Sequence, residues 1–170
     1  SASAQAIALM QQLYIPIIER HLSNHSALPP VPVVVTDLSS AEMIKYAANA
    51  FLATKISFIN EVANICDRVG ADVTQVARGI GLDSRIGSKF LQAGIGWGGS
   101  CLPKDVSALI HTANDYGYDA QLLKAAVGVN QRQRVIIVEK LQQVLKILKG
   151  KTVGLLGLTF KPDTDDMRDA

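Results

Sequence analysis

The sequence AEMIKYAANAFLATKISFINEVANICDRV, residues 41–69, contains neither glycine nor proline and decides the fold. Because these two residue types interrupt helices, the stretch predicts one helix, about 43 Å long, that stops at Gly70. A capping signal, Ser39 or Ser40 followed by Glu42, precedes it. Apolar positions surround much of the helix, which is typical of a central, buried element. The sequence therefore predicts a mainly helical domain built around this helix.

Polar side chains interrupt the apolar pattern at two positions of this helix. Lys45 and Asn49 are four residues apart, so they share one helix face and can reach a single site. A solvated polar stripe near the helix start explains the same spacing, and the pattern alone leaves both interpretations open. Cys66 lies in an apolar register with Val62 and Val69, which predicts a packing role for its thiol.

A second informative stretch reads GIGWGGSCLPKD, residues 94–105. Glycines let the backbone turn with positive φ and approach a ligand closely, and Ser100 is predicted to be the N-cap of a helix. Cys101 would then lie at a helix N-terminus, where the dipole and nearby Lys104 favour a thiolate. Asp105 follows one turn later on the same face. The stretch predicts a nucleophile and an acid facing one pocket; a plain loop with an inert thiol is the alternative.

Apolar spacing predicts four further helices and two short strands. The helices are expected at residues 3–21, 73–79, 100–116 and 120–148, and the strands at 31–36 and 152–160. Since a single strand needs partners, we interpret each one as part of an α/β domain whose other strands lie outside these residues.

The predicted fold class is therefore mainly α. A helical central domain with one long buried helix would be flanked by truncated α/β, Rossmann-like segments. The expected boundaries are 1–37 for the end of an N-terminal domain, 38–148 for the central domain and 149–170 for the start of a C-terminal domain.

Composition excludes several classes of function. The 17 basic and 15 acidic residues are spread along the chain without a basic run, so no nucleic-acid partner is expected. No apolar run reaches the roughly 18 residues of a membrane span, and the start lacks the basic region of a signal peptide, which predicts a cytoplasmic protein without membrane association. Both cysteines are expected to be reduced. His21 and His25 have metal-ligand spacing but no third ligand, so no metal site is predicted.

Four motifs, taken together and in order, resemble the nucleotide-sugar dehydrogenase family. They are the helix at 41–61, IGLDSRIGSKFL at 80–91, GGSCLPKD at 98–105 and GLTFKPDTDDMR at 157–168. The resemblance extends over essentially all 170 residues. It implies an N-terminal domain that binds NAD, a helical central domain that forms a homodimer, and a C-terminal domain that binds the nucleotide. The chain would be the middle of that arrangement.

The resemblance also implies a reaction, the oxidation of the C6 alcohol of a UDP-sugar to a carboxylate with NAD. Cys101 matches the nucleophile, which would carry a thiohemiacetal and then a thioester. Lys45 and Asn49 match the pair that faces the reacting oxygen, and Asp105 matches the acid that orients Lys45 or a water. The implied substrate contacts are Lys45, Asn49, Arg85 (toward the neighbouring subunit), Phe90, Leu91, Gln92, Ala93, Gly94, Gly98, Phe160 and Lys161. The implied NAD contacts are Lys104 and Arg168.

Departures from the family pattern leave alternatives open. The glycine fingerprint of the NAD fold and the loop with the family's glutamate base are absent, so these residues alone are predicted to be inactive. Residues 85–91 resemble the UDP-glucose type, but Leu102 also occurs in the GDP-mannose type, and a UDP-N-acetylmannosamine dehydrogenase is a further option. A non-catalytic helical dimerisation module is the alternative from another class. A thiol redox protein is disfavoured because no second cysteine lies nearby.

Overall fold

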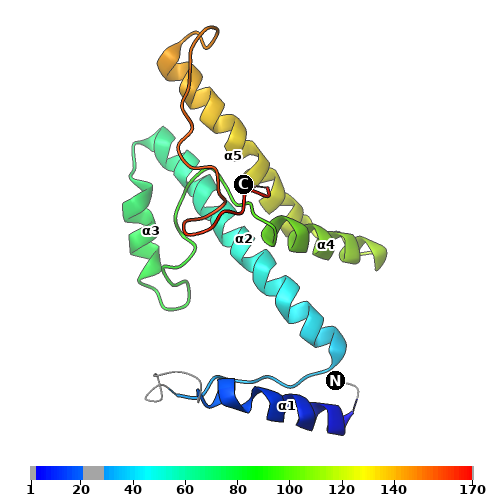
Figure 1. Cartoon of the computed structure of the whole chain (residues 1–170). Helices are drawn as coiled ribbons and strands as arrows, with labels where there is room; N and C mark the ends of the chain where they lie inside the picture. Colours follow the sequence, from blue (N-terminus) through cyan, green and yellow to red (C-terminus); the bar gives the residue numbers. More distant parts are fainter. Residues whose placement is uncertain (1–2, 21–28, 170) are drawn as a thin grey trace. The chain divides into compact units, whose positions relative to one another are not determined.

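Helices are the regular elements of the computed structural model, which describes residues 3–20 and 29–169. They are α1 (Ala4–Ile18), α2 (Leu38–Val69), α3 (Val73–Gly81), α4 (Leu102–Asp115) and α5 (Gln121–Leu145) (Figure 1). The predicted mainly helical fold is confirmed, and α2 is the long helix at its centre. The described residues of 1–45 form one unit, and those of 46–170 form another.

The two predicted strands are wrong for the residues that the structure describes. Residues 31–36 and 152–160 have no regular secondary structure, and their apolar side chains are open to solvent, with Val34 75% and Leu156 97% exposed. A strand is stabilised by hydrogen bonds to a neighbouring strand, and no described segment pairs with either stretch. Strand-forming residue types without a partner therefore remain extended chain.

The start of α2 differs from the sequence prediction because Asp37, not Ser39 or Ser40, caps it. Asp37 Oδ1 accepts the backbone N–H of Ser40 at 2.8 Å, and Oδ2 accepts the Ser40 hydroxyl at 2.6 Å. These bonds, with the side-chain bond first, lower the pKa of Asp37. The predicted end is confirmed: α2 stops at Val69, and Gly70 follows with a φ of 75° that suits glycine.

In the first unit, Ser3 caps α1 and accepts the N–H of Ala6 at 3.2 Å. The chain after the helix is tied back to its end, because the N–H of Val31 donates to the carbonyl of Ile18 at 2.8 Å. His21 and His25, considered above as metal ligands, lie outside the described residues.

In the second unit, α2, α4 and α5 pack around Trp97. The buried core consists of Ala50, Ala53, Trp97 and Val106. Ser57 of α2 donates its hydroxyl to the carbonyl of Ala126 on α5 at 2.8 Å, so these helices run side by side (Figure 1). Cys66 is buried, as its apolar register predicts. The segment that follows α3 and precedes α4 is thereby held between α2 and α5.

Replacing Ile59 with alanine tests how much the buried side of α2 contributes to stability. Ile59 is fully buried, so Ile59→Ala leaves a cavity and is expected to lower the free energy of unfolding by about 2–5 kcal/mol. Urea unfolding followed by circular dichroism measures the change. Ile147→Ala is the matched control, because Ile147 is 69% exposed and its truncation should cost less than about 0.5 kcal/mol. Equal losses for the two variants would contradict the assigned core.

Candidate active site

Buried polar side chains form hydrogen bonds with the glycine-rich loop, residues 94–101. Asn130 of α5 pairs with both backbone groups of Trp97: its Oδ1 accepts the Trp97 N–H at 2.7 Å, and its Nδ2 donates to the Trp97 carbonyl at 2.9 Å. The indole N–H of Trp97 donates to Ser57 Oγ of α2 at 2.9 Å. The loop is therefore anchored to two helices at one residue.

Cys101 ends this loop and presents an exposed thiol at the start of α4. It occupies the N-cap position itself, so the predicted role of Ser100 as N-cap is wrong; no side chain caps this helix. The Ser100 hydroxyl instead lies 3.8 Å from Cys101 Sγ. Because the first N–H groups of α4 receive no side-chain cap, they remain available near the thiol. Cys101 therefore lies at a helix N-terminus, as its motif predicts.

Asp105, one turn after Cys101, is the buried charge of the site. Its side chain is fully buried, its Oδ2 accepts the Asn49 amide at 2.6 Å, and its Oδ1 forms an ion pair with Lys104. The hydrogen bond to Asp105 is the main cause that raises the pKa of Lys104, and the negative charge of Asp105 acts in the same direction. Asp105 thus links Asn49 on α2 to the start of α4.

The structure adds Asn49 and Lys104 as partners of Asp105. The implied role of Asp105 in orienting Lys45 or a water stays a prediction. Asn49 is 56 residues away in the chain, so spacing could not have predicted the contact. Lys45 lies in the first unit, one helical turn before Asn49 on α2 and exposed, and its part in the site stays a prediction.

The segment after Phe160 packs against the glycine-rich loop from the other end of the chain. The Gly99 N–H donates to the Asp169 carbonyl at 3.0 Å. Gly99 has a φ of 81°, and a Cβ there would meet the Phe160 ring at 2.5 Å, so only glycine allows this approach. The Lys161 ammonium lies 5.3 Å from the centre of the same ring. Phe160 and Lys161, predicted as substrate contacts, therefore lie beside the loop that carries Cys101.

Arg168 brings a second cation to this side of the loop. Its guanidinium is paired with Asp166, with Nη2 and Nε each 2.8 Å from a carboxylate oxygen. The Arg168 side chain, its backbone N–H and the Ser100 hydroxyl together lower the pKa of Asp166 to about 2. The hydrogen bond to Asp166 is the main cause that raises the pKa of Arg168. The two predicted cofactor contacts are thus each paired with a carboxylate.

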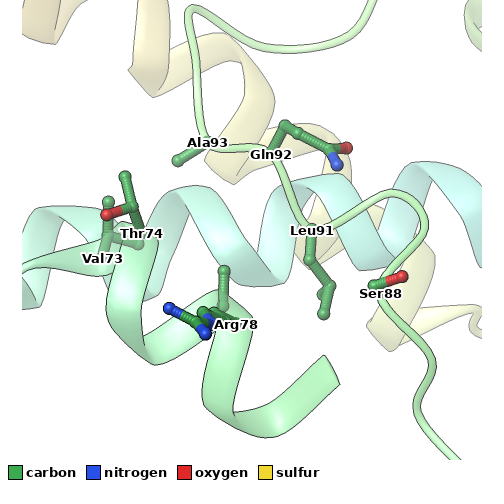
Figure 2. Close-up of a pocket in the computed structure, with 8 residues that line it drawn as sticks. Val73, Thr74, Arg78, Ser88, Leu91, Gln92 and Ala93 are labelled. Atoms are coloured by element: carbon green, nitrogen blue, oxygen red, sulfur yellow. The ribbon is translucent and has the colours of Figure 1, made fainter. Parts of the chain in front are cut away.

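The predicted substrate loop, residues 90–94, runs along α3. Phe90 has a φ of 64°, a conformation that costs a bulky residue about 1–2 kcal/mol, and neighbouring Leu91 is buried. The Gly94 N–H donates to Asn60 Oδ1 at 2.7 Å. Figure 2 shows the Leu91 side chain pointing from the loop toward α3. A pocket of about 350 Å³ between loop and helix is lined by Val73, Thr74, Ala77, Arg78, Ser88, Leu91, Gln92 and Ala93.

Arg85 is placed apart from these residues, in the turn after α3. Its guanidinium is 87% exposed and paired with Asp83 at 2.6 Å. Gly98 lies in the glycine-rich loop next to Gly99. The structure thus gathers Asn49, Cys101, Lys104 and Asp105 at the start of α4, and leaves Arg85 on the surface.

Comparison with known proteins decides the family. Residues 39–132 match the model of the UDP-glucose/GDP-mannose dehydrogenase family, central domain. The chain belongs to this family. The match covers α2 from its second residue, α3, α4, the glycine-rich loop and the first half of α5, and therefore the residues that meet around Asp105. The resemblance stated from the four motifs is confirmed.

Relatives of this family match the whole chain. It is 56% identical over 170 residues to UDP-glucose 6-dehydrogenase TuaD of Bacillus subtilis, covering 100% of this chain and 34% of that protein. UDP-glucose 6-dehydrogenase of Pseudomonas aeruginosa is 48% identical over 171 residues, with 100% and 36% covered. A UDP-glucose dehydrogenase structure from Pyrobaculum islandicum is 38% identical with a TM-score of 0.88, covering 99% and 36%. The chain thus spans about a third of the length of these dehydrogenases.

Sequence reasoning missed the residues that hold the loop in this family member. Ser57 and Asn60 on α2 and Asn130 on α5 are polar residues inside the buried faces of amphipathic helices. A polar residue in such a register is a signal of a buried hydrogen bond, but it does not name the partner.

No helix in residues 3–20 or 29–169 is long and apolar enough to cross a membrane.

Replacing Arg168 with glutamine tests the charge arrangement beside Cys101. Because the Arg168 bonds are the main cause of the lowered pKa, Arg168→Gln should raise the pKa of Asp166 from about 2 toward its ordinary 3.8. The pKa of Asp166 is depressed in the folded state, so its interaction with Arg168 stabilises the folded state above pH 3.8. This stabilisation is lost as the pH falls toward about 2. A carbon-detected NMR titration of the Asp166 carboxyl measures the shift.

The control for this titration is Arg132→Gln, which removes a guanidinium paired with Glu139 on α5. It should leave the titration of Asp166 unchanged. An Asp166 curve that is the same in the wild type and in Arg168→Gln would show that the pair does not form in solution.

Proposed function

We propose that the protein containing this chain oxidises the C6 alcohol of UDP-glucose to the carboxylate, producing UDP-glucuronate, with NAD as the oxidant. The observation that carries the proposal is the exposed Cys101 thiol one turn before the buried Asp105, in a member of this dehydrogenase family. The relatives named above are UDP-glucose dehydrogenases, which favours this nucleotide sugar.

Cys101 would act as the covalent carrier of the intermediate. Its Sγ adds to the aldehyde carbon formed by the first oxidation, and the aldehyde oxygen becomes the hydroxyl of a thiohemiacetal. Loss of a hydride and a proton from that carbon and hydroxyl gives a thioester. Water then attacks the thioester carbon, which releases the carboxylate and returns the thiol. The covalent bond keeps the aldehyde from leaving between the two oxidations.

Asn49 and Lys45 would stabilise the negative charge on the reacting oxygen. Asp105 supports this role because its carboxylate holds the Asn49 amide by a 2.6 Å bond, which fixes the orientation of that side chain. A buried carboxylate that is already bonded on both oxygens is suited to positioning its neighbours. We therefore assign Asp105 to orientation and Cys101 to covalent chemistry.

The chain's own cations fit part of an NAD site. Lys104 and Arg168 are exposed and come from separate segments, so they would bind anionic groups of the cofactor. When bound, NAD would supply the acceptor for the hydride lost in each oxidation. Both cations have an acidic neighbour, Asp105 or Asp166, that keeps the side chain in place.

The nucleotide sugar would bind along residues 90–94 with Gly98, Phe160 and Lys161. The strained Phe90 and the buried Leu91 give this loop a fixed shape, which favours recognition by backbone groups. Arg85 would reach the substrate bound to the neighbouring subunit, consistent with its exposed position after α3. GDP-mannose and UDP-N-acetylmannosamine remain the alternative substrates, and assays with each nucleotide sugar distinguish them.

Replacing Cys101 tests the covalent mechanism in the full-length protein. Cys101→Ala should lower the rate of NADH formation from UDP-glucose by at least about a thousandfold, because no thioester can form. NADH absorbance at saturating UDP-glucose and NAD measures the rate. Cys66→Ala is the matched control, since Cys66 is buried away from the loop, and should retain activity. Wild-type turnover by Cys101→Ala would overturn the mechanism, and turnover only with another nucleotide sugar would overturn the substrate.

A homodimer through α2 is proposed as the assembled form. Phe51, Phe58 and Ile65 repeat every seven residues and are 65%, 52% and 54% exposed. Seven residues are two helical turns, so the three side chains form one apolar stripe on α2. A second copy of the chain would cover this stripe.

A cytoplasmic location is inferred as well, because a nucleophilic Cys101 needs the reducing conditions found there.

Replacing the two aromatic residues of the stripe tests the dimer. Phe51→Ser with Phe58→Ser should raise the dimer dissociation constant by about a hundredfold or more, because buried aromatic anchors dominate interfaces. Sedimentation equilibrium measures the constant. Tyr116→Ser with Tyr118→Ser is the control, since these exposed tyrosines lie beyond α4, and should leave the dimer intact. A dimer of unchanged affinity after the first pair of substitutions would place the interface elsewhere.

A further inference from the structure

We propose that Asn130 is a positioning residue for Cys101. Its side-chain amide bonds to both backbone groups of Trp97 and thereby sets the path of the glycine-rich loop that delivers the thiol. The inference rests on the proposed role of Cys101 as nucleophile. The inference adds Asn130 on α5, 29 positions after Cys101, to the residues on which that role depends.

The geometry at Trp97 requires an asparagine amide. The backbone of Trp97 offers one donor and one acceptor. Its N–H donates to Asn130 Oδ1 at 2.7 Å, and its carbonyl accepts from Asn130 Nδ2 at 2.9 Å. A carboxylate lacks the donor and an aliphatic side chain lacks both groups. Asn130 and Trp97 are 5% and 7% exposed, so water cannot replace a lost bond without opening the core. The pair therefore holds one backbone position strongly.

Gly96 shows that the loop is fitted to this amide. It has a φ of 119°, and a Cβ at this position would overlap Asn130 Oδ1. The chain thus passes directly over the amide, at a distance that only glycine permits. A loop merely resting on α5 would not need this close approach.

The position of Cys101 depends on this anchor because only three residues, 98–100, separate Trp97 from Cys101. Gly99 within this short stretch is itself held, since its N–H donates to the Asp169 carbonyl at 3.0 Å. The Trp97 indole extends the anchor to α2 through Ser57 Oγ at 2.9 Å. Fixing Trp97 therefore limits where the thiol at the start of α4 can lie, and a displacement of about 1 Å at a reacting group can cost a hundredfold in rate.

Gln133 provides a matched control on the same helix. It is buried like Asn130 and lies one turn further along α5, but its Oε1 accepts the Asn64 amide of α2 at 3.0 Å and does not contact the loop. Truncating Asn130 removes two buried hydrogen bonds to the loop, whereas truncating Gln133 removes one part-buried hydrogen bond to α2. Only Asn130→Ala removes the anchor of the loop.

The experiment compares Asn130→Ala and Gln133→Ala at a temperature where both show wild-type helical circular dichroism. Trp97 is the only tryptophan of these 170 residues, so within them its emission reports on the anchor directly. We expect a red shift for Asn130→Ala as the indole gains access to water, and no shift for Gln133→Ala. Iodoacetamide labelling of Cys101, followed by mass spectrometry, should slow by about threefold or more for Asn130→Ala alone, because the thiol moves away from its cationic neighbours.

In the full-length protein, kcat for UDP-glucose should fall between about tenfold and a hundredfold for Asn130→Ala and stay near wild type for Gln133→Ala. Unchanged emission and unchanged Cys101 labelling in Asn130→Ala would overturn the positioning role, whatever the activity. A wild-type protein without activity on UDP-glucose would instead refute the proposed function, while emission and labelling would still decide the role of Asn130.

A second variant approaches the same contact from the loop. Gly96→Ala should reproduce the red shift and the slower labelling, because its new methyl group displaces the Asn130 amide. Combined with Asn130→Ala it should add little, since the bonds to Trp97 are already lost and coupled sites are not additive. Independent, fully additive effects on Cys101 labelling would show that the two residues do not act through one contact.

Discussion

The burial of the Asp105 carboxylate constrains the site more than any other interaction. A charge without solvent contact must be paired, because an isolated buried carboxylate costs several kcal/mol. Asp105 receives the Asn49 amide from α2 and the Lys104 ammonium from its own helix. This requirement fixes α4 against α2, and with it the place at which α4 begins. Since Cys101 is the residue before that helix, the position of the thiol follows from satisfying Asp105.

The second constraint acts on the other side of Cys101, where the chain has little stiffness. A loop with glycines at 96, 98 and 99 is able to approach a ligand, but it does not hold one shape by itself. Asn130, Ser57 and Phe160 supply the missing restraint from α5, α2 and the C-terminal segment. Loops that carry function in general combine a permissive backbone with a rigid scaffold, and the scaffold of this glycine-rich loop is polar as well as apolar.

Parts of the fold and the site could be read from residue types because their causes are local. The absence of glycine and proline gave the length of α2, and Gly70 marked its end. The four motifs, taken together and in order, identified the family correctly. Local preference failed where residues compete or need partners: Asp37 displaced Ser39 and Ser40 as the cap of α2, and the valines of 31–36 form no strand without a neighbour.

By itself, the sequence determined the helical class, the order of the helices and the residues with chemical character, because periodicity and motif spacing depend on neighbours in the chain. Only the tertiary structure decided which of those residues meet. Asn49 with Asp105, Asn130 with Trp97 and Gly99 with Phe160 are pairs from distant parts of the chain. The physical reason is that a buried hydrogen bond or a close contact specifies a geometry but leaves the sequence distance between its partners free.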